Sequence, residues 1–334
     1  MYNQPLTRQG FGDMVDAFRR DATARPILVT GGTGQLASAL ADQGGTRVRR
    51  VGRPEFDFDQ PETIAAVFGA VRPWLVVNAA AYTAVDKAET DEAAAWRANR
   101  DGPAELARLC AAAGVPLIHV STDYVYDGDK QEPYVETDPV GPRGVYGASK
   151  LAGEEAIRAS GARAIILRTA WVYAATGRNF VLTMLDLARS RDSLRVVADQ
   201  HGCPTAAADL AAGILAIATL LETDGWRDDR AGVFHAAGSG DTTWHGFAQA
   251  VFENAARHGA KVPATVVKIA TADYPTPARR PANSRLDCGR LEAVFGVRLP
   301  YWRDSLARTV DEIFAARAFS PPSIPRGYPM LKDP

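Results

Sequence analysis

Tyr146 and Lys150 stand four residues apart in a helix-like stretch and form a pair that could carry out proton transfer. At that spacing two side chains lie on one face of a helix. A free phenol titrates near pH ~10, and a neighbouring ammonium group stabilises the phenolate and lowers that pKa. The pair therefore predicts a general acid that protonates the alkoxide formed when a hydride reaches a carbonyl carbon. Taken alone, such a pair is equally typical of a solvated helix face.

Ser121, Thr122 and Asp123 follow an apolar stretch upstream of that pair. A hydroxyl group at the end of a strand can hydrogen-bond the oxygen of a reacting carbonyl group, so these residues are candidates for the same site. The alternative is a strand-end turn with an Asx cap.

A glycine motif precedes both features. Gly31, Gly34 and Ala37 form a G-x-x-G-x-x-A pattern between a strand-like and a helix-like stretch. Glycines let the backbone turn sharply and approach a pyrophosphate, which the following helix N-terminus also favours. This spacing is typical of short-chain dehydrogenases and predicts a dinucleotide site. The order of the three features favours one shared site over coincidence.

The end of the second expected strand indicates which dinucleotide binds. An NAD enzyme usually places Asp or Glu there for the ribose hydroxyls, whereas this chain has Gly52 and Arg53 after Arg49 and Arg50. A guanidinium group in place of the acid suits a 2′-phosphate, so the sequence favours NADPH. Glu55 lies close by, and a solvated strand edge is the alternative for the arginines.

These motifs need a scaffold that brings the strand ends together. Strand-like and helix-like stretches alternate along the chain, which predicts an α/β fold: a Rossmann-type doubly wound parallel sheet with a smaller C-terminal α/β substrate-binding portion. The expected strands are 26–30, 47–51, 74–78, 116–121, 164–169, 194–197 and 232–235. The expected helices are 35–43, 61–71, 88–113 (broken near Gly102), 145–160, 179–190, 207–222, 243–258 and 302–317, and the Pro-rich stretch 274–283 is expected to be extended. The expected organisation is an extension at 1–25, a dinucleotide-binding domain at 26–173 and a mainly substrate-binding portion at 174–334, with the chain crossing between the two.

Composition narrows the class of partner. Lys and Arg together number 38 against 39 Asp plus Glu, a balance that gives no long-range attraction to nucleic acid or to an anionic membrane.

Cys110, Cys203 and Cys288 form no C-x-x-C pair, which indicates a reducing, cytoplasmic setting. The five histidines show no metal-ligand spacing, so no metal is expected. No signal peptide or membrane span is expected, and residues 1–25 are expected to be a frayed extension.

These residues and their neighbours resemble dTDP-4-dehydrorhamnose reductases, in the extended short-chain dehydrogenase superfamily. The matching segments are 77–89, 121–128, 133–138, 146–154, 168–173, 179–185, 199–205 and 274–286. The last three, NFVLTML, DQHGCPT and YPTPARRPANSRL, separate this family from generic epimerases and dehydratases.

The resemblance implies NADPH-dependent reduction of the C4 keto group of dTDP-4-dehydro-β-L-rhamnose to dTDP-β-L-rhamnose, for cell-surface polysaccharide. It implies catalytic roles for Tyr146, Lys150 and Thr122. The cofactor residues that it implies, together with those from the motifs above, are Gly31, Gly34, Gln35 and Leu36 at the pyrophosphate, Arg53 at the 2′-phosphate, Asp57 and Phe58 at the adenine, Ala81, Tyr82 and Thr83 at the nicotinamide, and Lys150 at its ribose. Substrate contacts are implied for Thr122, Asp123, Tyr146 and Trp171, although Trp171 could equally be a core aromatic residue.

Two departures from the family pattern qualify the resemblance. Some members bind magnesium at a dimer interface through a Glu of the first helix, where this chain has Ser38 and Ala39, so neither that metal nor that dimer is expected. The choice between monomer and homodimer stays open. The N-terminal extension has no counterpart.

Two other functions stay open at this point. One is a reductase or epimerase of another nucleotide-linked deoxysugar, with the same Tyr/Lys chemistry. The other is a non-catalytic, dinucleotide-binding regulatory subunit, which has no need of Tyr146 and Lys150. The loop that holds Asp129, Lys130, Glu132 and Arg143 either closes over the substrate or is a solvated surface loop.

Overall fold

A six-stranded parallel sheet forms the centre of the protein, in a computed structural model that describes residues 25–317. The strand order is β10-β5-β4-β3-β1-β2, and every pairing is parallel. The strands are β1 (Ile27–Thr30), β2 (Val48–Val51), β3 (Leu75–Asn78), β4 (Leu117–Thr122), β5 (Ala164–Thr169) and β10 (Gly232–His235). The order reverses between β1 and β3, which is where a doubly wound sheet opens a crevice at its carboxyl edge. The predicted fold class is confirmed.

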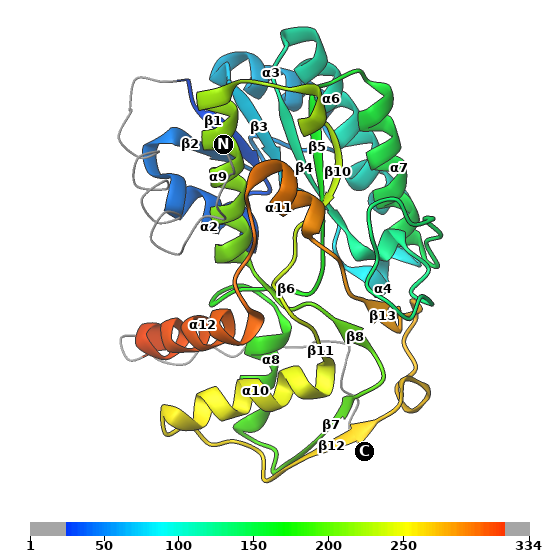
Figure 1. The fold of residues 1–334 in the computed structure, drawn as a ribbon, viewed down its shortest axis with the longest axis vertical. Helices are drawn as coiled ribbons and strands as arrows, with labels where there is room; N and C mark the ends of the chain where they lie inside the picture. The colour runs from blue at the N-terminus through cyan, green and yellow to red at the C-terminus, as the bar shows by residue number, and fades with distance from the viewer. Residues whose placement is uncertain (1–24, 318–334) are drawn as a thin grey trace.

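Helices cover both faces of this sheet (Figure 1). One face packs against α3 (Pro61–Val71), α6 (Gly102–Ala113) and α7 (Val145–Ala159), through residues such as Ile64, Leu106 and Ile157. The other face packs against α2 (Gln35–Gly44), α9 (Ala207–Asp224) and α11 (Gly289–Phe295). Because both faces are covered, the inner strands β1 and β3 are continuous, fully buried runs rather than alternating ones, whereas the edge strand β2 leaves Arg49 and Arg50 exposed.

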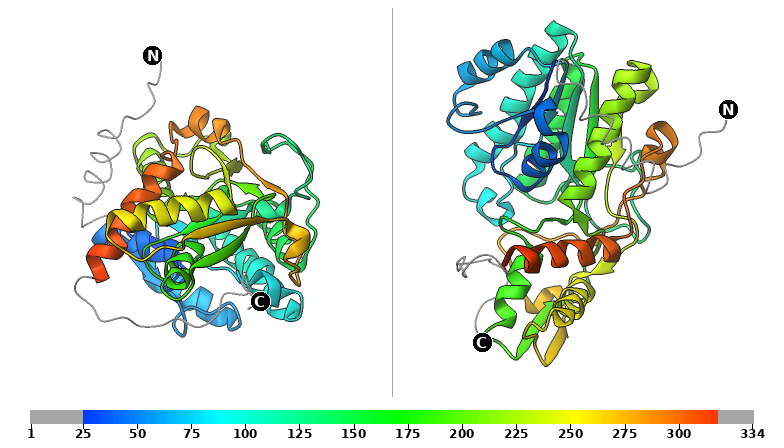
Figure 2. Two further views of the ribbon diagram at one scale, coloured as in Figure 1. Left: turned by 90° about the horizontal axis from the view of Figure 1, so that it is seen from below. Right: turned by 90° about the vertical axis from the view of Figure 1, so that its left-hand side faces the viewer.

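A second core lies beyond the carboxyl edge of the sheet, in the lower half of Figure 1. It is built from α8 (Phe180–Ala188), α10 (Trp244–Arg257) and α12 (Trp302–Arg317), with the parallel pair β7 (Ser193–Val197) and β12 (Thr265–Ile269). Figure 2 shows α12 lying across the junction between this core and the sheet. Phe247 centres the cluster, with Phe180 stacked on it at 5.4 Å and Trp302 edge-on at 5.7 Å.

Short strand pairs connect the two cores. They are β6 (Val172–Tyr173) with β9 (Thr205–Ala206), and β8 (His201–Gly202) flanked by β11 (Thr242–Thr243) and β13 (Asn283–Ser284). The chain returns from the second core to the sheet, since α9 and β10 pack there although both follow residue 174.

The helix expected at 88–113 has a different form. The structure has α4 (Val85–Ala88) and then a helix from α5 (Glu92–Trp96) through a π-helical turn, η2 (Arg97–Asp101), into α6. The expected break near Gly102 is wrong. The π-helical turn η2 accommodates Pro103, which has no backbone N–H to donate, without interrupting the helix. Gly102 is needed for another reason, since a Cβ there would lie 2.2 Å from the Phe58 ring.

Other elements differ less from expectation. The sequence did not predict three kinds of element: the short strands of the connecting region, β12 and α11. Each of them is brief or half exposed, so its periodicity is weak. The expected extension at 1–25 lies almost entirely outside the described residues. Within residues 25–317 no helix combines the length and apolar character that a membrane crossing requires.

Candidate active site

A cavity of about 920 Å³ opens at the carboxyl edge of the sheet. The residues that line it include every site residue predicted from the sequence: Gly31, Gly34, Gln35, Leu36, Arg53, Asp57, Phe58, Ala81, Tyr82, Thr83, Thr122, Asp123, Tyr146, Lys150 and Trp171. They come from segments far apart in the chain, and the parallel strands bring them together because all of these strands end at the same edge.

The glycine loop after β1 forms one end of the cavity. Gly31 and Gly32 have positive φ angles of 110° and 53°, which favour glycine. A Cβ at Gly31 would lie 3.0 Å from the Ala79 carbonyl group, and a Cβ at Gly52 would lie 2.4 Å from Gly32 Cα. The Gly34 N–H closes the turn on Gly31 O at 2.9 Å, and α2 starts at once. The loop therefore leaves a smooth backbone cradle beside a helix N-terminus, which suits a pyrophosphate.

Arg53 lies at the rim of this cradle. Its Nε donates to Asp57 Oδ1 at 2.8 Å and its Nη2 to Asp59 Oδ2 at 2.7 Å, while 66% of its side chain stays exposed. Two carboxylates thus orient the guanidinium group at the mouth of the cavity. Glu55, the rival acid in the sequence, pairs with Arg49 instead.

Tyr146 and Thr122 lie together in the lining of the cavity, and both are buried. Burial raises the pKa of Tyr146 to about 12, against a smaller lowering by its hydrogen bond with Thr122, and Asp123 raises it further. Tyr124 packs edge-on against the Tyr146 ring at 5.4 Å. The expected lowering of this pKa by Lys150 is wrong for this structure, where burial dominates. A phenol with a raised pKa stays protonated at neutral pH and is able to donate its proton.

Lys150 reaches the same region from the next turn of α7, and it is fully buried. Its Nζ donates to Val120 O at 2.7 Å and lies 3.2 Å from His119 Nε2. Burial lowers the pKa of Lys150 to about 8, although Glu154 raises it. The ammonium form is therefore held less firmly than that of an exposed lysine.

Asp123 follows Thr122, whose hydroxyl donates to Asp123 Oδ1 at 3.1 Å. Burial raises the pKa of Asp123 to about 6, against hydrogen bonds from Ser284 and Thr122 that lower it. Ser121 faces away from the reaction centre, because its hydroxyl donates to Glu154 Oε1 at 2.5 Å. Of the two hydroxyl groups in this motif, that of Thr122 is the one beside Tyr146.

Trp171 forms a wall of the cavity in an uncommon conformation. Its φ angle is 49°, in the left-handed region that side chains other than glycine rarely adopt. Its ring stacks on Trp244 at a centroid distance of 3.5 Å and an interplanar angle of 9°. Gly202 lies against the same ring, since a Cβ there would come within 2.3 Å of it. Backbone strain of this kind concentrates at functional sites, and the fixed indole offers one face to the cavity.

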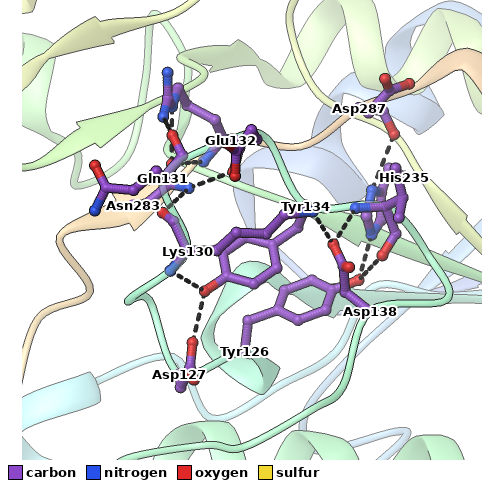
Figure 3. Close-up of polar contacts among 12 residues, drawn as sticks. Tyr126, Asp127, Lys130, Gln131, Glu132, Tyr134, Asp138, His235, Asn283 and Asp287 are labelled. Atoms are coloured by element: carbon purple, nitrogen blue, oxygen red, sulfur yellow. Dashed lines mark hydrogen bonds and ion pairs between the residues drawn. The ribbon is translucent and has the colours of Figure 1, made fainter.

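Hydrogen bonds and an ion pair hold the loop at 127–144 in place (Figure 3). Lys130 pairs with Asp138 at 2.5 Å, and Tyr134 stacks on Tyr126 at 4.2 Å. Asn283 Nδ2 donates to the carbonyl oxygens of Lys130 and Glu132, both at 2.8 Å. The four charged residues singled out in the loop, Asp129, Lys130, Glu132 and Arg143, are absent from the cavity lining. In this structure the loop lies at the surface, with Asp129 and Arg143 about half exposed, and hydrogen bonds fasten it to the Pro-rich segment.

Two buried groups next to the site escaped the sequence analysis. Glu154 and Arg168 form an ion pair behind Ser121, and His119 contacts Lys150. Their positions in the sequence lie close to the recognised motifs. Glu154 is the last residue of the YGASKLAGE stretch, and His119 lies two residues before Ser121. Nothing local to the sequence indicated that these side chains point inward.

At Ser38 and Ala39 the first helix offers no acid for a magnesium ion. Ser38 Oγ accepts a hydrogen bond from Arg50 Nη1 at 2.8 Å, so a positive charge already lies beside that position. Across residues 25–317, no three His, Cys, Asp or Glu side chains gather in a way that could hold a metal ion.

Comparison with known proteins decides the family. The model of the RmlD substrate binding domain family matches residues 25–314. The chain belongs to the dTDP-4-dehydrorhamnose reductase family. The family member from Sinorhizobium fredii is 47% identical over 287 residues, which cover 85% of this chain and 96% of that one. The member from Escherichia coli K12 is 41% identical, over 87% of this chain and 99% of that one.

Solved structures of dTDP-4-dehydrorhamnose reductases share the fold. That of the Clostridium acetobutylicum enzyme matches with a TM-score of 0.78 at 35% identity, over 86% of this chain and 99% of that chain. That of the Bacillus anthracis enzyme, a complex with NADP, matches with a TM-score of 0.78 at 31% identity, over 87% and 100%. The family resemblance stated from the motifs is confirmed.

Proposed function

We propose that this protein catalyses the NADPH-dependent reduction of the C4 keto group of dTDP-4-dehydro-β-L-rhamnose to dTDP-β-L-rhamnose. The observation that carries the proposal is the meeting of Thr122, Tyr146 and Lys150 in one cavity with the glycine loop at Gly31. Family members at 40–47% identity that bear this enzyme name support the choice of substrate.

The cavity fits a dinucleotide. The absence of a Cβ at Gly31 and Gly52 lets the backbone segments of the cradle pack closely, against Ala79 and Gly32 respectively. Gly34, Gln35 and Leu36 would contact the pyrophosphate at the start of α2. Arg53 would meet the 2′-phosphate, and the complex of a family member with NADP supports that choice. The adenine would lie at Asp57 and Phe58, and the nicotinamide at Ala81, Tyr82 and Thr83, all of which line the cavity.

The reacting groups divide the work. When bound, NADPH supplies the hydride. Thr122 Oγ1 would hydrogen-bond the C4 oxygen of the sugar, and the Tyr146 hydroxyl would give that oxygen its proton. Lys150 would hold the nicotinamide ribose, and Asp123 would bind a hydroxyl group of the sugar. Trp171 offers a rigid flat wall for the sugar ring, since Trp244 holds its other face.

The proposal includes a setting for the enzyme. Its partner is a small nucleotide-linked sugar and not a nucleic acid, because charges of both signs balance along the chain. Cys110, Cys203 and Cys288 are all free thiols, which supports a cytoplasmic location. The assembly is a monomer or a homodimer.

The test is NADPH consumption, followed by its absorbance, with dTDP-4-dehydrorhamnose generated enzymatically in the same cuvette. Turnover should be robust and should fall by about 10²-fold or more in Tyr146→Phe, which removes the transferable proton while NADPH still binds. Dinucleotide binding with no oxidation by this substrate would overturn the proposal; other keto sugars in the same assay would then separate a related reductase from a regulatory subunit.

A further inference from the structure

Behind Lys150 a chain of buried polar groups crosses three strands of the sheet. Thr30 of β1, Asn78 of β3 and His119 of β4 are each at most 1% exposed. Thr30 Oγ1 donates to Asn78 Oδ1 at 2.6 Å, Asn78 Nδ2 meets His119 Nδ1 at 2.9 Å, and His119 Nε2 meets Lys150 Nζ at 3.2 Å. None of the roles proposed above uses Asn78 or His119.

A backbone group sets the direction of this chain. The N–H of Ala80 lies 3.2 Å from Thr30 Oγ1 and 3.3 Å from Asn78 Oδ1, and it can only donate. The Thr30 hydroxyl and the Ala80 N–H both donate to Asn78 Oδ1, so the oxygen of the Asn78 amide faces them and its NH₂ group faces His119. His119 Nδ1 then accepts a hydrogen bond and carries no proton. In the neutral imidazole the proton must lie on Nε2, the nitrogen that faces Lys150.

The imidazole stays neutral in this position. Burial, together with the nearby Lys150, holds the pKa of His119 well below its usual range. An Nε2–H group is a donor, and the ammonium form of Lys150 has only donors. The inner position of Nζ, between His119 and Val120 O, therefore suits the neutral amine, which accepts from His119 and donates to Val120.

We propose that His119 is a positioning residue for Lys150: its Nε2–H group reserves the inner position of Nζ for the neutral amine and directs the ammonium form toward the cavity. The charged or titratable groups that act on Lys150 are His119 of β4 and Glu154 of its own helix, the latter paired with Arg168 of β5. This inference rests on the proposed function only for what the ammonium group meets in the cavity, the nicotinamide ribose.

The first experiment reads the two nitrogens of His119 in the full-length protein without substrate or cofactor. In ¹⁵N-histidine-labelled protein near neutral pH, the ¹⁵N shifts should show a protonated Nε2 and a bare Nδ1, with assignment by His119→Gln. A protonated Nδ1 with a bare Nε2 would overturn the proposal, because His119 would then be an ordinary acceptor for the ammonium group. If the variant at position 119 misfolds, the signals of the other four histidines can be assigned instead with His201→Gln, His235→Gln, His245→Gln and His258→Gln, which leaves those of His119 by exclusion.

The second experiment follows the Nζ of Lys150 by ¹⁵N-lysine NMR across pH, with assignment by Lys150→Met. His119→Gln provides an amide oxygen that can accept from an ammonium group, so the pKa of Lys150 should rise by about one unit or more. The matched control is His245→Gln, a buried histidine of α10 that contacts Val266 O, is absent from the cavity lining and should leave Lys150 unchanged. An unshifted Lys150 in His119→Gln would overturn the proposal. Since neither readout uses turnover, an inactive protein with the expected tautomer would overturn the proposed function and leave this inference standing.

Discussion

Arg168 Nη2 lies 2.6 Å from Glu154 Oε2, and the exposed fractions of the two side chains are 3% and 0%. A second hydrogen bond joins Arg168 Nε to Glu154 Oε1 at 2.9 Å, so the guanidinium group binds the carboxylate at both oxygens. The pair ties β5 to α7, the helix that carries Tyr146 and Lys150. Each partner is costly to bury alone, which makes the pair a sensitive point of the fold.

Glu154→Gln should therefore lower the free energy of unfolding by about 3–5 kcal/mol, because it leaves the Arg168 charge buried without a counter-charge. Urea denaturation measures the loss. The control is Glu105→Gln, which breaks the exposed pair with Arg108 and should cost at most about 1 kcal/mol. Equal small losses in both variants would mean that burial adds nothing to the pair at position 154.

Arg53 offers a test of cofactor choice. Arg53→Ala should weaken NADPH binding by about 10-fold or more and leave NADH binding nearly unchanged, because a charge-assisted hydrogen bond to the 2′-phosphate is worth about 1.5–3 kcal/mol. Fluorescence titration with both cofactors measures the difference. Arg100→Ala is the matched control, since Arg100 is equally placed at the surface but pairs with Asp101 away from the cavity lining. Equal weakening of both cofactors by Arg53→Ala would show that Arg53 does not contact the 2′-phosphate.

Gly202 tests the role of the Trp171 wall without a change to the tryptophan itself. Gly202→Ala adds a Cβ 2.3 Å from the indole ring, so the ring must leave its stack with Trp244. We expect KM for the nucleotide sugar to rise about 10-fold, the effect of roughly 1.4 kcal/mol, with the Kd for NADPH unchanged. Gly69→Ala is the control, because an added Cβ there meets nothing within 4 Å. An unchanged KM in Gly202→Ala would mean that the sugar does not use this wall.

The raised pKa of Asp123 leads us to expect that the free energy of unfolding depends on pH. Its folded-state pKa of about 6 lies above the ordinary value of about 3.9, so the native protein binds this proton more tightly than the unfolded chain does. Above pH ~6 the buried carboxylate destabilises the fold by on the order of 3 kcal/mol, and the penalty disappears as the pH falls toward about 4. Asp123→Asn should accordingly raise the free energy of unfolding at about pH 7.5 and change it little at about pH 4, at the expense of turnover.

Asp138 is the control, because its pKa is shifted in the opposite direction to that of Asp123. Its ion pair with Lys130 holds its pKa below the usual range, so its contribution is stabilising at neutral pH and is lost in acid. Asp138→Asn should destabilise the protein at about pH 7.5, with the loss shrinking as the pH falls. If Asp123→Asn follows the pH profile of Asp138→Asn, the Asp123 carboxylate is stabilised rather than penalised by its surroundings.

Local patterns in the sequence predict many of the helices and strands of the fold. The bounds of α3, β5, β10 and α12 match the predicted ranges because each has a clear apolar periodicity and a clear start or stop signal. The site could be predicted for a related reason: in a parallel sheet, residues that follow different strands must meet at one edge, so positions in the sequence translate into a place in space. All of the predicted site residues do line one cavity.

Other features depend on contacts between distant segments. The protonation of Tyr146 follows from burial and not from the spacing of Lys150, whose Nζ is engaged by His119 and Val120. The Trp171–Trp244 stack joins two segments whose sequences carry no sign of one another.

The sequence by itself thus determined the family, the order of strands and helices and the set of residues at the carboxyl edge, because periodicity and motif spacing are local properties of the chain. Tertiary structure alone decided which way each polar group faces and what charge it holds. Those depend on desolvation and on hydrogen-bond partners such as Asn78 and His119, which lie 41 residues apart in the chain and 2.9 Å apart in the fold.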